Sequence, residues 1–250
     1  MKHYWDEDAP SAVGRIHSFQ SMGAVDGPGM RCVLFLQGCP LRCAYCHNPD
    51  TWAYEGGVAT TAQDEARRIL RYRPYIRRGG VTVSGGEPLG QPEFVAELFG
   101  RLRQEGLHTA LDTSGVGGRD AAAQVLEETD LVLCDIKFPT EEGYQAHTGG
   151  SLAAVLGFLE QVRERRIPLW IRHGVVPGLT DGEASLRQVG RLAQACPTLE
   201  KLELLPFRKL CVSKYDALGI PFPLEGAPEM DAAGLAHARE LLQKEGLPVG

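Results

Sequence analysis

The chain has 250 residues, 43% of them apolar and 23% charged, the composition of a globular protein large enough to bury a substantial core. Its formal net charge is −6, which argues against nucleic acid as the main partner, because phosphate binding usually needs an excess of basic residues. The first residues lack the apolar stretch of a signal peptide, and no later run could span a bilayer. We therefore expect a cytoplasmic protein with no membrane partner.

Two kinds of pattern alternate along the chain. We expect residues 1–13 to form a flexible tail and residues 14–250 to form one domain, since no linker or internal repeat divides them. Runs rich in Leu, Val and Ile predict six buried strands, at residues 31–38, 81–86, 107–115, 131–137, 168–178 and 201–207. Amphipathic stretches predict helices at Thr61–Arg73, Pro92–Glu105, Asp120–Glu128, Leu152–Arg166, Glu183–Ala195 and Ala232–Glu245. Thr61 and Asp64 resemble a capping box at the start of the first helix.

Strands that alternate with helices predict an α/β protein with a parallel sheet. No Gly-x-Gly-x-x-Gly pattern follows the first strand, so a dinucleotide-binding fold has no support. We expect a partial (β/α)6 TIM-like barrel with parallel strands and outer helices. An open doubly wound sheet is the alternative.

Every predicted strand ends in groups that can bind a charged ligand. The first strand leads into a cysteine-rich loop, and the others end at residues 84–87, residues 112–114, Asp135 with Lys137, Arg172 with His173, and residues 207–209. Solubility alone places polar residues at strand ends, so each group taken singly is weak evidence. In βα barrels the C-terminal strand ends meet at one rim, where chemistry gathers, so we expect these groups to surround one site.

Three of the seven cysteines, Cys39, Cys43 and Cys46, lie within one short loop. They could hold three irons of a cubane and leave the fourth iron open, bind zinc together with His47, or be structural thiols. Adjacent Cys46 and His47 would be awkward in one tetrahedral shell, which favours the iron–sulfur cluster. The remaining cysteines are scattered, and we expect them to be inert thiols: Cys32, Cys134, Cys196 and Cys211.

The C-x3-C-x2-C spacing, with Tyr45 before the last cysteine, resembles the signature loop of radical S-adenosylmethionine (radical SAM) enzymes. The resemblance runs from Gly14 to the C-terminus through VDGPG, YCHNPDTW, VTVSGGEPL, LDTSG, DIK, WIRHGVVPGLTD and LELLPF. Together these segments resemble the glycyl radical enzyme activases, the family that includes the activating enzymes of pyruvate formate-lyase. The cysteine-rich insert of some other activases is absent, which favours the simpler type.

The resemblance implies a single radical SAM partial-barrel domain at residues 14–250 with a [4Fe-4S] cluster on Cys39, Cys43 and Cys46. The open iron would bind S-adenosylmethionine (SAM), whose reductive cleavage leads to hydrogen abstraction from a glycine Cα. The implied partner is pyruvate formate-lyase, whose glycine loop becomes a glycyl radical. A flavodoxin- or ferredoxin-type protein would donate the electron, in anaerobic glucose metabolism.

The resemblance also assigns individual residues. Lys137 would pair with the methionyl carboxylate and act with the three cysteines in catalysis, within a SAM site made of Tyr45, Cys46, His47, Gly85, Gly86, Asp135, Ile136, Lys137 and Arg208. A monovalent cation would lie among Asp112, Thr113, Leu133 and Asp135. Asp26 and Arg172 would face the substrate peptide. The alternatives are ordinary ones: tight turns at the glycines and Asp26, a solvated charge at Lys137, packing at the aromatic rings, and capping by the carboxylates.

One departure from the family pattern follows the last predicted strand. Arg208 stands where the family commonly has His, and Cys211 stands where it has Gly. Arginine can still bind a carboxylate, but it is longer and always charged. This departure bears on the geometry of ligand binding and on the choice of partner. The alternative functions are activation of another glycyl radical enzyme, radical chemistry on a small molecule, or a zinc-binding interaction module.

Overall fold

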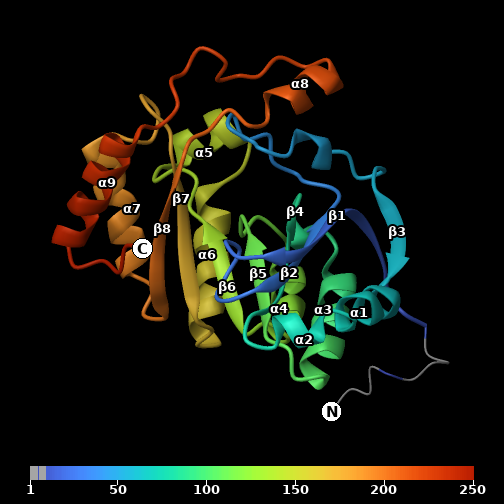
Figure 1. Ribbon diagram of the computed structural model, residues 1–250. Helices are drawn as coiled ribbons and strands as arrows, with labels where there is room; N and C mark the ends of the chain where they lie inside the picture. The colour runs from blue at the N-terminus through green and yellow to red at the C-terminus, as the bar shows by residue number, and fades with distance from the viewer. Residues whose placement is uncertain (1–4, 6–9) are drawn as a thin grey trace. The chain divides into compact units, whose positions relative to one another are not determined.

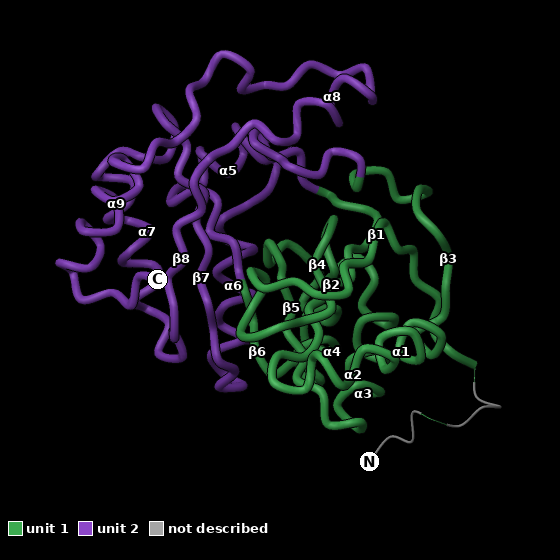
Figure 2. Tube along the Cα trace, viewed as in Figure 1, with its two compact units in different colours: residues 1–40, 51–133 green, residues 41–50, 134–250 purple. Residues whose placement is uncertain are grey.

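A computed structural model describes residue 5 and residues 10–250, which fall into two compact units (Figure 1, Figure 2). The described part of unit 1 is residues 5, 10–40 and 51–133, and unit 2 is residues 41–50 and 134–250. Most of the predicted flexible tail at residues 1–13 lies outside the described residues. Of its last residues, Ser11 and Ala12 donate hydrogen bonds to the Glu97 carboxylate, at 2.6 and 2.8 Å.

The structure contains the predicted alternation of strands and helices. The strands are β1 (Val13–Gly23), β2 (Arg31–Leu36), β3 (Val58–Thr61), β4 (Gly80–Gly85), β5 (Thr109–Thr113), β6 (Leu131–Asp135), β7 (Leu169–Val175) and β8 (Leu199–Pro206). The helices are α1 (Ala62–Leu70), α2 (Arg73–Ile76), α3 (Pro92–Gln104), α4 (Arg119–Leu126), α5 (Glu141–Thr148), α6 (Leu152–Glu164), α7 (Glu183–Gln194), α8 (Val212–Leu218) and α9 (Ala232–Lys244).

Hydrogen bonds order the strands as β3-β1-β2-β4-β5-β6-β7-β8, and β6 is the strand at which the residue ranges of the two units meet. Strand β2 is parallel to β4, β4 to β5, and β7 to β8. At the other end of the order, β1 is antiparallel to both β2 and β3. All six predicted strands are present, and β1 and β3 were not predicted.

Local sequence signals account for most helix boundaries. Five of the six predicted helices agree with the structure within two residues at each end. The first one, predicted at Thr61–Arg73, ends earlier, at Leu70. Its predicted cap is confirmed, since the Thr61 hydroxyl accepts the Asp64 N–H at 3.0 Å. The short helices α2, α5 and α8 were not predicted.

Unit 1 has its core between β2, β4, β5 and the helices α3 and α1. Leu34, Val83 and Leu111 are fully buried on the strands, and Leu98 and Phe99 are fully buried on α3. Burial of such side chains is worth roughly 2 kcal/mol each. The strands are therefore held in place from one face, which leaves the residues of the opposite face free to carry polar groups.

Unit 2 has a comparable division along β7. Leu169, Ile171 and His173 are buried, whereas Trp170 and Arg172 alternate with them and are half-buried. The helices α7 and α9 pack beside β8 (Figure 1). None of the helices in the described part of the chain is long and apolar enough to cross a membrane.

Candidate active site

The cysteine loop follows β2 directly. Cys39 belongs to unit 1, where its N–H donates to the Trp52 carbonyl at 3.3 Å. Cys43 and Cys46 belong to unit 2, where the Cys46 N–H donates to the Cys43 carbonyl at 3.0 Å. The Cys46 sulfur accepts the Asn48 N–H at 3.4 Å.

Residues 41–50 are fastened to unit 2 through their backbone. The Arg42 and Ala44 N–H groups donate to carbonyl oxygens at the end of α5, those of Thr148 and His147, each at 2.8 Å. The Tyr215 hydroxyl, on α8, donates to the Cys46 carbonyl at 3.2 Å. This explains why α5 and α8 matter to the site although neither was predicted.

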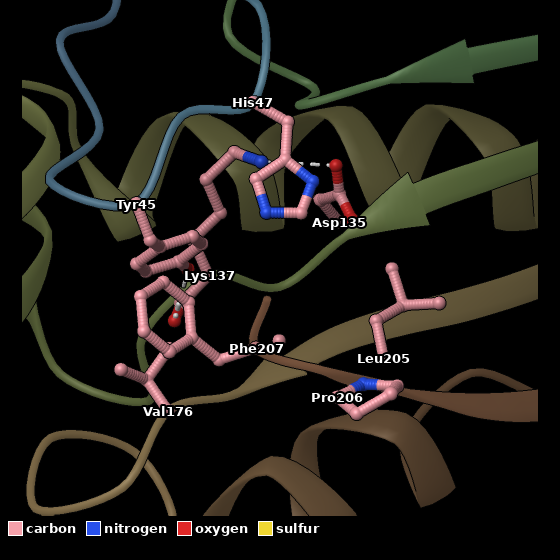
Figure 3. Close-up of a pocket in the computed structure, with 9 residues that line it drawn as sticks. Tyr45, His47, Asp135, Lys137, Val176, Leu205, Pro206 and Phe207 are labelled. Atoms are coloured by element: carbon pink, nitrogen blue, oxygen red, sulfur yellow. Dashed lines mark hydrogen bonds and ion pairs between the residues drawn. The ribbon is translucent and has the colours of Figure 1, made fainter. Parts of the chain in front are cut away.

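A pocket of about 130 Å³ lies beside this loop within unit 2 (Figure 3). Polar side chains reach it from the cysteine loop and from the end of β6, and a largely apolar wall comes from the ends of β7 and β8. The lining residues are Tyr45, His47, Asp135, Lys137, Gly174, Val176, Leu205, Pro206 and Phe207. Four of the predicted SAM-site residues thus come together here, namely Tyr45, His47, Asp135 and Lys137.

The charged pair of the pocket is Lys137 and Asp135, with Nζ 2.9 Å from Oδ2. Burial is the largest single influence on Lys137 and would lower its pKa, but the charge and hydrogen bond of Asp135, together with Cys43 and Tyr45, hold that pKa well above its ordinary value. Burial is likewise the largest single influence on Asp135 and would raise its pKa, but the charges of Lys137, Arg172 and His173 and the hydrogen bond from Lys137 together lower it. Both side chains are therefore charged, and Lys137 has two further N–H donors to offer an anion.

Backbone around the pair is held by a tyrosine that the sequence did not single out. The Tyr144 hydroxyl, on α5, accepts the Lys137 N–H at 2.9 Å and donates to the Asp135 carbonyl at 3.3 Å. The predicted site residue Ile136 is fully buried, and its N–H donates to the Arg172 carbonyl at 3.0 Å. Tyr45 donates to the Lys137 carbonyl at 3.2 Å. The spacing between residues 137 and 144 gave no signal for this contact.

Arg208 does not line the pocket. Its guanidinium donates to the carbonyls of Phe207, at 3.2 Å, and Met230. Its own carbonyl lies 2.9 Å from Nε2 of His47 and orients that imidazole. The departure from the family pattern thus reaches the pocket through the backbone of Arg208 and the ring of His47.

In unit 1, the ends of β4 and β5 carry the next group of predicted residues. A Cβ at Gly85 would lie 2.2 Å from the Leu36 nitrogen, and a Cβ at Gly86 would lie 2.1 Å from the Gly38 oxygen. Only glycine fits at either position, because the strand end packs against the start of the cysteine loop. This packing accounts for both glycines structurally, and their predicted contact with SAM stays a prediction.

Glu87 organises the same strand ends and was not among the predicted site residues. Its carboxylate is 1% exposed and accepts hydrogen bonds from the Thr113 hydroxyl at 2.6 Å and the Ser114 N–H at 2.8 Å. Burial raises the pKa of Glu87, and these hydrogen bonds oppose the increase. Asp112, the next residue of the predicted cation set, accepts the Ser84 hydroxyl at 2.6 Å.

The predicted cation set is divided between the units. Asp112, Thr113 and Leu133 lie in unit 1, and Asp135 lies in unit 2, where it pairs with Lys137. Within the described ranges, no three His, Cys, Asp or Glu side chains converge on a single ion position. The cation therefore stays a prediction.

Asp26 lies in a tight loop of unit 1 held by a buried arginine. The Asp26 carbonyl accepts the Thr82 hydroxyl at 2.6 Å, and that hydroxyl accepts Nε–H of Arg31 at 2.7 Å. Gly27 has φ of +123°, and a Cβ there would lie 3.1 Å from the Arg31 stem. Arg172, the other predicted peptide contact, is in unit 2 on β7, with Nε 3.2 Å from Oε2 of Glu203.

Comparison with known proteins decides the family. The radical SAM superfamily pattern matches residues 33–188. The chain is 45% identical to a pyruvate formate-lyase-activating enzyme of Clostridium pasteurianum over 221 residues, 88% of this chain and 92% of that one. It is 39% identical to the pyruvate formate-lyase 1-activating enzyme of Escherichia coli K12 over 240 residues, 94% and 98% of the two chains. The chain belongs to the radical SAM superfamily, in the family of these activating enzymes.

The fold of this radical SAM protein has solved counterparts. A domain of a pyruvate-formate lyase-activating enzyme from Bacteroides vulgatus superposes with a TM-score of 0.57 at 24% identity, covering 69% of this chain and 98% of that one. This likeness concerns the fold alone. It confirms the predicted α/β class, a partial (β/α)6 TIM-like barrel.

Membership of the radical SAM superfamily implies a [4Fe-4S] cluster and SAM, and the residues present fit both groups. Three thiols on one loop are the donor set that such a cluster requires, each thiolate binding a separate iron. Burial raises the pKa of Cys43 to about 11, opposed by the charge of Lys137, so deprotonation of this thiol depends on metal binding. For SAM, the pocket offers the Lys137 ammonium and an apolar wall that includes Val176 and Phe207.

Proposed function

We propose that this protein activates pyruvate formate-lyase by generating a glycyl radical on it. The observation that carries the proposal is the 45% identity to the Clostridium pasteurianum activating enzyme over 92% of that enzyme's length. The cysteine loop and the pocket beside it supply the groups that the reaction requires.

When bound, the reduced cluster supplies the electron that cleaves SAM, so that hydrogen is removed from a glycine Cα of the partner. The thiolates of Cys39, Cys43 and Cys46 would hold the cluster. The Lys137 ammonium binds the methionyl carboxylate, and the Asp135 carboxylate keeps that ammonium charged and oriented. Tyr144 fixes the backbone of both residues. The apolar wall of the pocket excludes water from the site.

Further residues extend the proposal to the remaining ligands. Gly85, Gly86 and Arg208 complete the SAM site, Arg208 by orienting His47. A monovalent cation binds at Asp112, Thr113, Asp135 and the Leu133 carbonyl. Asp26 and Arg172 hold the peptide that carries the glycine. A flavodoxin- or ferredoxin-type donor and a cytoplasmic location complete the proposal.

Electron paramagnetic resonance tests the function directly. The reconstituted, reduced enzyme is mixed anaerobically with SAM and pyruvate formate-lyase, and the expected result is the doublet of a glycyl radical. Formation of 5′-deoxyadenosine without a doublet would show that the protein cleaves SAM but acts on another substrate. A second glycyl radical enzyme serves as the parallel arm, because the Arg208 and Cys211 departures bear on the choice of partner.

A further inference from the structure

One face of the β7–β8 ladder carries three successive pairs of facing residues. In the register of the two strands, the pairs are Gly174 with Leu205, Arg172 with Glu203, and Trp170 with Lys201. Because side chains alternate along a strand, residues two apart share a face. The first pair lines the pocket. The second and third pairs therefore lie on the same face toward the N-terminal ends of the strands, at about 7 and 14 Å from the first pair.

The middle pair is held by a shared carboxylate. Glu203 has Oε2 3.2 Å from Nε of Arg172 and Oε1 2.7 Å from Nζ of Lys201. The Arg172, Glu203 and Lys201 side chains are 12%, 17% and 28% exposed, so their charges are only partly screened by water. The Glu203 carboxylate thus holds both the Arg172 guanidinium and the Lys201 ammonium. The three side chains together carry a net charge of +1.

The outer pair combines a cation with an aromatic ring. The Lys201 ammonium lies 4.5 Å from the centroid of the Trp170 ring, a cation–π contact. Trp170 is half-buried, and its indole N–H makes no hydrogen bond within the described part of the chain. An indole held in this way presents a rigid apolar surface and an open donor, the features of an anchor for polypeptide.

We propose that Trp170 and Lys201 form an outer subsite for the extended polypeptide that flanks the reacting glycine. The inference rests on the proposed function, because it needs a polypeptide substrate whose glycine lies at the pocket. An extended chain rises about 3.4 Å per residue, the same as the strands. With the glycine at the Gly174 pair, a residue about two positions away faces Arg172 and one about four positions away faces Trp170.

The chemistry of the subsite defines what it accepts. The indole N–H donates to a substrate carbonyl and the ring packs against an apolar side chain, while the Lys201 stem lies against Gly250. The excess positive charge disfavours a basic residue at this position. Glu203 is a positioning residue, since it holds Arg172 and Lys201 without meeting the substrate itself.

Direct peptide binding tests the subsite without turnover. The reconstituted enzyme, with SAM and without reductant, is titrated into fluorescent peptides copied from the glycine loop of pyruvate formate-lyase. A long peptide carries about five residues on each side of the glycine, and a short one carries about two, too few to reach Trp170. Anisotropy reports the affinity for each peptide.

Trp170→Ala and Lys201→Met should weaken binding of the long peptide about tenfold and leave binding of the short peptide unchanged. Lys244→Met is the matched control, because Lys244 is exposed on α9. This variant should bind both peptides as the wild type does. Trp170→Phe keeps an aromatic ring but loses the indole N–H, so it should lose part of the affinity for the long peptide. It replaces Trp170→Ala in the test if the alanine variant fails to fold. SAM affinity should be the same in all variants.

Different results would contradict the outer subsite and the proposed function. If Trp170→Ala or Trp170→Phe weakens both peptides equally, or neither, the outer subsite is wrong although the proposed function stands. Equal affinity of the wild type for the long and short peptides would also overturn it. If the wild type binds neither peptide and forms no glycyl radical on pyruvate formate-lyase, the proposed function itself fails and the subsite falls with it.

Discussion

The Lys137 ammonium lies 2.9 Å from the carboxylate of Asp135, two residues before it at the end of β6. Residues i and i+2 share one face of an extended segment, so the sequence Asp-Ile-Lys places an acid and a base side by side and buries the residue between them. The ion pair holds the Lys137 ammonium in a pocket whose opposite wall is apolar.

Loss of the Lys137 ammonium should reduce the affinity of the enzyme for SAM. We expect Lys137→Met to weaken SAM binding by at least about tenfold, because a charge-assisted bond to the carboxylate is worth about 1.5–3 kcal/mol. Lys137→Arg should retain part of it. Equilibrium dialysis of labelled SAM with the reconstituted enzyme measures the effect, and Lys244→Met is the control. Equal affinity of Lys137→Met and the wild type would remove Lys137 from the SAM site.

The cysteines should separate into two classes. Cys39→Ala, Cys43→Ala or Cys46→Ala should lose the cluster, because a cubane held by two protein ligands dissociates readily. Cys32→Ala and Cys134→Ala should retain it, since both of these thiols are fully buried and outside the loop. Iron and sulfide analysis after anaerobic reconstitution measures the difference. Retention of a full cluster by Cys43→Ala would overturn the ligand assignment.

Glu87 should make stability depend on pH. Burial raises its pKa above the ordinary 4.5, so the folded state binds the proton more tightly than the unfolded state does. Its contribution is therefore fully present below pH 4.5 and is lost as the pH rises through the folded pKa. Each unit of pKa corresponds to about 1.4 kcal/mol.

Glu87→Gln removes this titration. Urea unfolding of the apo-protein gives the free energy of unfolding of the wild type and of the variant at each pH. The difference, wild type minus variant, should be largest at low pH and should decrease as the pH rises. Parallel curves for the two proteins would mean that Glu87 has the same pKa in both states.

Two glycines with positive φ should differ in their tolerance of a side chain. Gly27 has φ of +123° and would bring a Cβ within 3.1 Å of the buried Arg31 stem, whereas Gly106 has φ of +75° with nothing within 4 Å. Gly27→Ala should therefore destabilise the protein by about 1–2 kcal/mol more than Gly106→Ala. Thermal unfolding compares them. Because the Gly27 loop carries Asp26, the first variant should also lower the yield of glycyl radical, and equal behaviour of the two would contradict this account.

The sequence by itself determined the features that depend on local order. Apolar runs predicted the six parallel strands, and the Thr61 cap predicted where α1 begins, because each is decided by residues close together in the chain. Cysteine spacing likewise predicts a cluster donor set, and that ligand assignment stays a prediction. The strands β1 and β3 were not predicted, because their partly exposed residues mix polar and apolar types without a buried apolar run.

Only the tertiary structure decided which distant residues meet. The Tyr144 hydroxyl on the Lys137 backbone, the Glu87 carboxylate under Thr113 and Ser114, and the β7–β8 register all require elements separated in sequence to be packed first. A one-residue shift of that register would turn one strand's side chains to the other face and separate Trp170 from Lys201. Such partners are selected by packing and burial, which no short stretch of sequence contains.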